Sequence, residues 1–278
     1  MKLTKFALTA ALVLAGSVLQ SAHAQTPVVY TDGDLFMGFR STTSTNDYLW
    51  DIGQFSLFNN DPVGFHLALG NINLDLTTVF GSGWQTNNNV QWGAAGTHDF
   101  DASGNLIANL YATKVEPTIG TRALAWTRQS TSAQIGSSSQ IETLAFGGFF
   151  GNLSTANNPT AIIQSTTGVS WASFQPGGTN TTGGSFSTWV PTIEGPTTPG
   201  VGTGIPGTRL DLFEILPDNS GTNPASKYIG TFSIDAAGNV SYDVFAAVPE
   251  PSTYASLIAG AGLLLVMLRF RSRGSLNA

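Results

Sequence analysis

The C-terminal segment of this chain constrains its possible fold more than any other feature. Residues 252–268 contain no charged side chain, and Arg269, Arg271 and Arg273 follow them directly. As a helix, this run would span roughly 25 Å, close to the bilayer hydrocarbon thickness of about 30 Å. Arginines beside an apolar run favour the cytoplasmic side and stop the segment in the membrane. We therefore expect a single C-terminal transmembrane helix; a helix buried in the folded domain is the alternative.

A short motif precedes the apolar run. Pro249, Glu250 and Pro251 hold the backbone extended, because proline cannot continue into the interior of a helix. The motif, the apolar run and the arginines all lie within the last thirty residues, and together they resemble the PEP-CTERM sorting signal of exported Gram-negative bacterial proteins. The resemblance implies recognition and cleavage by an exosortase, a membrane-embedded cysteine transpeptidase-like enzyme. It further implies an inner-membrane-anchored precursor that is later delivered to the cell surface or extracellular space.

The N-terminus has the layout of a secretory signal peptide. Lys2 and Lys5 precede an apolar stretch at residues 6–19, and Ala22 and Ala24 form a small-x-small cleavage site. We expect cleavage after residue 24, with an uncleaved anchor as the alternative. The chain then divides into a signal peptide at 1–24, an exported domain at 25–248, and a sorting and membrane-anchor segment at 249–278.

The composition of residues 25–248 excludes some function classes. This region has six Lys and Arg against sixteen Asp and Glu, a net charge of −10. Nucleic-acid binding requires a cationic surface, so we exclude it. The chain contains no cysteine, so no disulfide can stabilise the exported domain. Its length is enough for one β-rich domain with its own apolar core.

The pattern of short apolar runs and glycine-rich turns favours a mainly β, sandwich-like domain with minor short helices. Strands are predicted at residues 35–39, 48–58 and 210–216, and short helices at 71–81 and 140–150. The first helix should end at Gly81, since glycine commonly ends a helix. Residues 176–207 contain nine glycines and five prolines, which predicts a long loop.

One stretch of sequence occurs twice. Residues 96–106 and 230–240 align at an offset of 134 and share an Asp-Ala-x-Gly-Asn core. Gly104 and Gly238 supply the positive φ that a short hairpin loop needs. We expect two similar hairpins. Whether they arose by duplication or are two independent uses of one turn stays open.

We assign no catalytic residue. His66 and His98 are the only histidines in residues 25–248, and the chain has neither a Gly-x-Ser-x-Gly elbow nor a His-Glu-x-x-His helix. Asp32 and Asp34 form a carboxylate pair around a glycine, a pattern that turns also use. Five tryptophans are candidates either for sugar stacking or for core packing, and packing is favoured: Trp84, Trp92, Trp126, Trp171 and Trp189.

No cofactor is expected, and the metal candidates are weak. Asp99, Asp101 and Ser103 have the spacing with which a calcium-binding loop begins. Position 12 of such a loop would be Leu110, where a bidentate glutamate is needed. A structural turn therefore explains the pattern better than a metal site.

These observations predict an exported structural or binding protein of the cell surface or extracellular matrix, and not an enzyme. Its expected partners are an exosortase-type enzyme, the membrane through the C-terminal helix, and extracellular polysaccharide. Two alternatives remain: a secreted carbohydrate-active or other hydrolase, and a calcium-stiffened adhesin.

Overall fold

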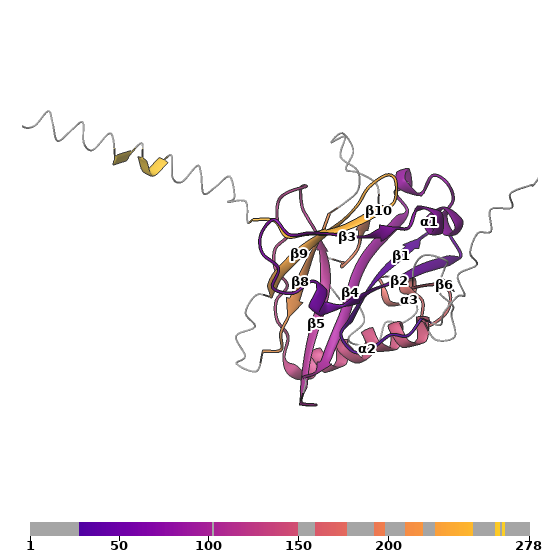
Figure 1. The fold of residues 1–278 in the computed structure, drawn as a ribbon, viewed down its shortest axis with the longest axis horizontal. Helices are drawn as coiled ribbons and strands as arrows, with labels where there is room; N and C mark the ends of the chain where they lie inside the picture. Colours follow the sequence, from indigo (N-terminus) through magenta and orange to yellow (C-terminus); the bar gives the residue numbers. More distant parts are fainter. Residues whose placement is uncertain are drawn as a thin grey trace, which may run out of the picture.

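One antiparallel sheet dominates the computed structural model of the chain (Figure 1). The structure describes residues 28–101, 103–149, 159–176, 192–197, 209–218, 226–246, 259–261 and 263–264. The strand order is β3-β10-β9-β8-β5-β4-β1-β2-β6, and β7 pairs with β4. The strands are β1 (Asp34–Ser41), β2 (Asn46–Gln54), β3 (His66–Asn71), β4 (Val90–Phe100), β5 (Leu106–Val115), β6 (Thr160–Gln164), β7 (Gly195–Pro196), β8 (Leu210–Ile215), β9 (Lys227–Ile234) and β10 (Asn239–Asp243). The helices are α1 (Asn73–Phe80), α2 (Thr131–Phe149) and α3 (Trp171–Phe174), with 3-10 turns at Phe55–Leu57 and Trp84–Thr86.

The sheet has an apolar core on each face. Side chains alternate along β1, so that Leu35 and Met37 enter the inner core whereas Phe36 enters the outer one. The inner core joins distant parts of the curled sheet, since the ring of Phe58, just beyond β2, lies 5.6 Å from the Phe232 ring of β9. The mainly β prediction is confirmed. A sandwich of two separate sheets was also expected, and here one curled sheet encloses the inner core instead.

Two helices, α2 and α3, pack on the outer face. α2 lies against β4 and β5, and α3 lies against β1 and β2 (Figure 1). The predicted helix at 140–150 was too short, because α2 begins at Thr131. Close packing explains how a Gly- and Ser-rich sequence is held as a helix: Cβ atoms at Gly147 and Gly148 would lie 2.5 and 2.6 Å from Val169 and Leu49. The shorter α1 matches its prediction and ends at Gly81 with a φ of 88°.

Trp171 anchors α3 to the sheet. Its indole lies where Gly38 and Gly93 have no side chain; a Cβ on Gly38 would lie 1.9 Å from the ring. The indole Nε1 donates to Glu194 Oε1 at 2.6 Å, and Glu194 also accepts two bonds to its Oε2 from Arg40, at 2.9 and 2.7 Å. These contacts join two strands, a helix and the segment that contains β7.

Part of the predicted 176–207 loop therefore belongs to the core. Within residues 192–197, Ile193 is fully buried and Glu194 nearly so, and β7 pairs with Gln91 and Trp92 of β4. Residues 177–191 and 198–207 lie outside the described part of the chain.

The two repeated stretches are confirmed as hairpins of the same sheet, β4–β5 and β9–β10. Gly104 and Gly238 both have a φ of 79°. Asp101 and Asp235 each accept, through Oδ1, the backbone N–H of residues two and four positions later, at 2.8–2.9 Å. The two turns thus share both backbone conformation and side-chain bonding.

Candidate binding site on the outer face of the sheet

Beyond the area that α2 and α3 cover, the outer face of the sheet carries polar side chains. Asp211 of β8, Thr231 of β9, Asp243 of β10 and His66 of β3 are consecutive partners across four strands. Thr231 Oγ1 donates to Asp211 Oδ1 at 2.7 Å, and His66 Nδ1 lies 2.7 Å from Asp243 Oδ1. This row marks the side of the sheet that is available for polar recognition.

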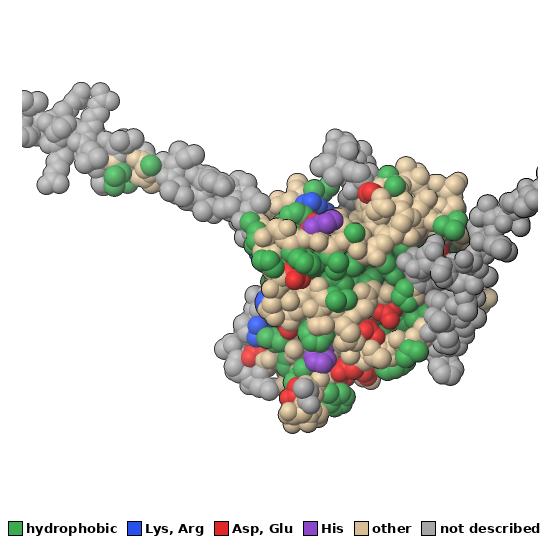
Figure 2. Space-filling view, in the orientation of Figure 1, with side chains coloured by type: hydrophobic (Ala, Val, Ile, Leu, Met, Phe, Trp, Pro, Cys, Tyr) green, Lys and Arg blue, Asp and Glu red, His purple; other side chains and the backbone are tan. Residues whose placement is uncertain are grey.

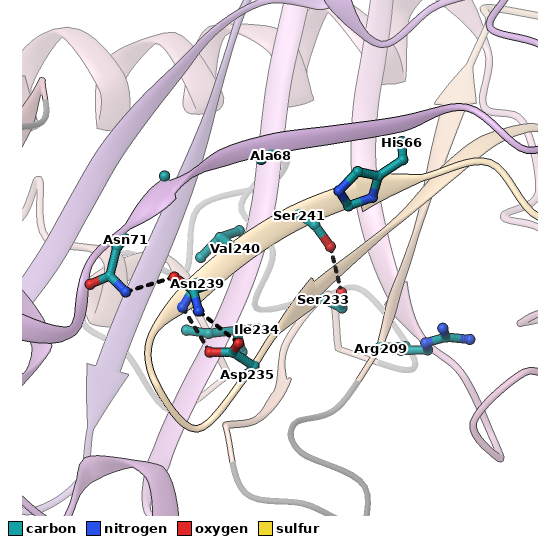
Figure 3. Close-up of a pocket in the computed structure, with 11 residues that line it drawn as sticks. His66, Ala68, Asn71, Arg209, Ser233, Ile234, Asp235, Asn239, Val240 and Ser241 are labelled. Carbon is teal, nitrogen blue, oxygen red and sulfur yellow. Dashed lines mark hydrogen bonds between the residues drawn. The ribbon is translucent and has the colours of Figure 1, made fainter.

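A groove of about 640 Å³ lies over β3, β10 and β9 (Figure 3). Its polar lining offers hydroxyl, amide, imidazole, guanidinium and carboxylate groups, from Ser233, Ser241, Asn71, Asn239, His66, Arg209 and Asp235. Asn71 Nδ2 donates to Asn239 Oδ1 at 2.8 Å, and the two serine hydroxyls lie 2.9 Å apart. Figure 3 shows the asparagines at one end of the groove and Arg209 toward the other.

Two further hollows adjoin the groove. One, of about 260 Å³, shares Arg209 with the groove and is also lined by Glu116 and Asp211. We call this the second hollow. The third hollow, of about 330 Å³, shares Arg122, Tyr228 and Phe245 with the second hollow. Because neighbouring hollows share lining residues, we treat the three as one recessed surface, which we call the outer-face site. The few Lys and Arg side chains visible in Figure 2 lie toward the side of the molecule that carries β8, β9 and β10.

Aromatic rings hold the two arginines of the second hollow. The guanidinium of Arg122 lies 3.6 Å from the centroid of the Tyr228 ring, and that of Arg209 lies 4.3 Å from Phe245. Such cation–π contacts fix the position of a guanidinium without neutralising its charge. Arg122 Nη2 also donates to the Phe245 carbonyl oxygen at 3.0 Å. Within the described part of the chain, neither arginine forms an ion pair.

Two carboxyl groups face the same hollow. Burial raises the pKa of Glu116 to about 7, and it also raises the pKa of Asp211. The oxygens of Asp211 accept from the Ala123 N–H at 2.6 Å and from Thr231 at 2.7 Å, so both are occupied. Glu116 Oε2 accepts from the Gly120 N–H at 2.6 Å. Near neutral pH, Glu116 therefore carries only part of a negative charge.

Neither histidine lies in the arrangement that a serine hydrolase needs. In such a triad, histidine stands between the serine and the carboxylate. Here Asp243 stands in the middle, since it accepts from Ser241 at 3.0 Å through one oxygen and lies 2.7 Å from His66 through the other. His98 lies apart from this group, 3.3 Å from Asp32 Oδ2.

The weak metal candidates point in different directions. Asp99 is buried and accepts a hydrogen bond from Ser138 of α2. Asp101 instead accepts from the N–H groups of Ser103 and Asn105 at 2.9 and 2.8 Å, within the hairpin turn. Among the described residues, no group of three or more His, Asp or Glu side chains is placed to hold a metal ion.

The Asp32–Asp34 pair and the tryptophans, which were the remaining candidate site residues, mainly stabilise the fold. Asp34 accepts from Thr31 in its own turn and from Gln54 of β2, whereas Asp32 accepts from the Asp99 N–H of β4 at 2.7 Å, so both carboxylates fasten this turn to the sheet. Core packing is confirmed for four tryptophans, Trp84, Trp92, Trp126 and Trp171. Trp189 lies outside the described residues.

The candidate processing sites also lie outside the described residues. They are Ala22 and Ala24, Pro249, Glu250 and Pro251, and Arg269, Arg271 and Arg273. Of the predicted membrane segment, only residues 259–261 and 263–264 are described, and they are helical. In the part of the chain that the structure describes, no helix has the length and apolar character needed to cross a bilayer.

Little in the sequence points to the outer-face site. Arg122, Arg209 and Tyr228 come from segments far apart in the chain, and no motif joins them. The one available signal is the scarcity of Lys and Arg in residues 25–248. Because there are only six, each one is a candidate for binding an acidic group. Comparisons with protein-family models, curated proteins and solved structures found no match to this chain.

Proposed function

We propose that the chain is an exported protein of the cell surface or extracellular matrix that binds polysaccharide at the outer-face site. The observation that carries the proposal is the lining of the groove by hydroxyl, amide, imidazole, guanidinium and carboxylate groups. These groups complement sugar hydroxyls, which both donate and accept hydrogen bonds. The volume of about 640 Å³ lies in the usual range for a small-ligand site, so the groove can hold a short stretch of a polymer.

The terminal segments support the same location. The predicted signal peptide and the resemblance of residues 249–278 to a sorting signal favour export, membrane anchoring and processing by an exosortase-type enzyme. A polysaccharide of the cell surface or matrix is the polymer that such a protein would meet there.

Affinity electrophoresis tests the binding role. The full-length chain, in a mild detergent, is run through native gels that contain dextran or polygalacturonate. We expect at least one polymer to retard it, and Ser241→Ala, which removes a groove hydroxyl, to weaken binding about fivefold. Thr143→Ala, which removes an exposed hydroxyl of α2, is the matched control and should bind as the unmodified chain does. The absence of retardation by either polymer would contradict the proposal.

The sorting role has its own test. Cells that produce the Pro249→Ala, Glu250→Ala double variant should keep the protein in the inner membrane, whereas Thr253→Ala should be delivered normally. Fractionation followed by immunoblotting measures both. Equal surface delivery of the double variant would refute the sorting assignment.

A glycoside hydrolase is the second candidate, and one observation favours it. Glu116, with a pKa of about 7, shares a hollow with Asp211, and hydrolases use a carboxyl group that stays protonated near neutral pH. Release of reducing ends from the same polymers, lost in Glu116→Gln, would establish this activity. Binding without release at pH 5–7 would leave the binding function in place.

A further inference from the structure

The outer-face site also indicates what kind of polysaccharide it binds, an inference that rests on the proposed function. We infer that Arg122 and Arg209 bind carboxylate groups of an acidic polysaccharide, in the hollow that adjoins the groove.

The charges of the exported domain are distributed in a way that supports this inference. Only six Lys and Arg side chains occur in residues 25–248, so the domain is acidic as a whole. Arg40 and Lys227 lie 2.7 and 3.8 Å from protein carboxylates. Arg122 and Arg209 line one hollow together and form no ion pair within the described residues. Two arginines that form no close ion pair within the described residues thus share one recess with Glu116 and Asp211, whose carboxyl groups lie near enough to interact with both charges.

The two guanidinium groups are positioned before any ligand arrives. Each lies over an aromatic ring, and Arg122 is further fixed by its bond to the Phe245 carbonyl oxygen. A guanidinium carries five N–H groups in a planar fork that matches a carboxylate, and one bond to a carbonyl leaves most of them available. Because the groups are held in place, binding costs less side-chain entropy than it would for mobile arginines.

The connection between the hollows points to a sugar as the source of the carboxylate. Arg209 lines both the groove and the second hollow. A polymer that lies in the groove beside Ser233 and Ser241 would therefore place an acidic substituent next to Arg209. A ligand without hydroxyl groups would leave the polar lining of the groove unused.

Acidic side chains in the hollow modulate this binding. Glu116 is faced by Arg122, Arg209, Asp211 and Tyr228. Burial raises its pKa to about 7, so it gains a proton as the pH falls from 8 to 6 and the hollow becomes more positive. Sugar carboxylates stay ionised over this range. Affinity for an acidic polymer should therefore rise as the pH falls, and Glu116→Gln should bind at pH 8 as the unmodified chain binds at pH 6.

Isothermal titration of the full-length chain in detergent tests the inference, with polygalacturonate, dextran and polyglutamate as probes. We expect polygalacturonate to bind best and Arg122→Gln or Arg209→Gln to weaken it about tenfold. Arg128→Gln removes the same charge from a residue that lines none of the three hollows, so it should have less than about a twofold effect. Arg209→Lys keeps the charge but not the planar fork, and it should bind with an intermediate affinity if the arginine geometry matters.

Each contrary result has a distinct meaning. Equal binding of dextran and polygalacturonate, unchanged in both arginine variants, would overturn the inference and leave the polysaccharide-binding proposal standing. Failure of every polymer to bind would overturn both. Polyglutamate binding as tight as polygalacturonate binding would refute an acidic sugar as the ligand. Equal losses in Arg209→Gln and Arg128→Gln would show that net charge, and not the hollow, determines affinity.

Discussion

Replacement of Glu194 by glutamine tests the packing account most sharply. The Glu194 side chain is 1% exposed and accepts bonds from Arg40 and from the Trp171 indole. Glu194→Gln keeps the shape but removes the negative charge, so that Arg40 is left without its ionic partner. Removing one member of a buried ion pair typically costs about 3–5 kcal/mol.

The expected loss lies at the lower end of this range. The Arg40 side chain is 20% exposed, so water can partly solvate it once its partner is neutral. We therefore expect the free energy of unfolding to fall by about 3 kcal/mol. For a folded region of this size, the corresponding drop in melting temperature is about 6–12 °C.

Urea unfolding of the full-length chain, followed by tryptophan fluorescence, measures the loss. Glu142→Gln is the control, because Glu142 lies half-buried on α2 and its neutralisation should cost less than about 0.5 kcal/mol. Replacing both partners, in Arg40→Met with Glu194→Met, should cost less than Glu194→Gln alone, since no unpaired charge remains. A loss below about 1 kcal/mol in Glu194→Gln would refute the reasoning.

Three further predictions concern stability. Gly38→Ala should destabilise the fold by about 3 kcal/mol because its Cβ would lie 1.9 Å from an indole, whereas Gly136→Ala in α2, with no atom within 4 Å, should stabilise it by about 0.5–1 kcal/mol; equal urea midpoints would contradict this. Burial raises the pKa of Asp47 to about 7, so the stability tied to its protonation is complete below about pH 4 and is lost as the pH rises through 7. Asp47→Asn should therefore gain about 2 kcal/mol at pH 8 and little at pH 5, and an unchanged pH profile would exclude this origin. Asp101→Ala and Asp235→Ala should each lower the melting temperature, because each removes a side-chain acceptor from its turn, and losses that differ widely would show that the two turns are not equivalent.

Features set by local sequence were predictable. Both hairpins follow from the Asp-Ala-x-Gly-Asn pattern, because turn residues impose their conformation within a few positions. The end of α1 at Gly81 follows from the same kind of local rule. The burial of four tryptophans follows from the general preference of large rings for the interior.

Features set by distant contacts were not predictable. The first half of α2, from Thr131, is rich in serine and glycine and weak in helix propensity, so its helicity depends on packing against β4 and β5. Glu194 lies in a Gly- and Pro-rich segment, and only its partner Arg40, 154 positions away, accounts for its burial. Arg122 and Arg209 become a site only after the sheet brings β5, β8 and β9 together. No spacing rule connects such residues.

Hydrogen–deuterium exchange of the full-length chain, with and without polygalacturonate, tests the central claim most directly. Polysaccharide binding at the outer-face site predicts slower exchange at residues 66–71, 209–211 and 228–245, with α2 unchanged. Slower exchange confined to α2, or no difference anywhere in the described residues, would contradict it.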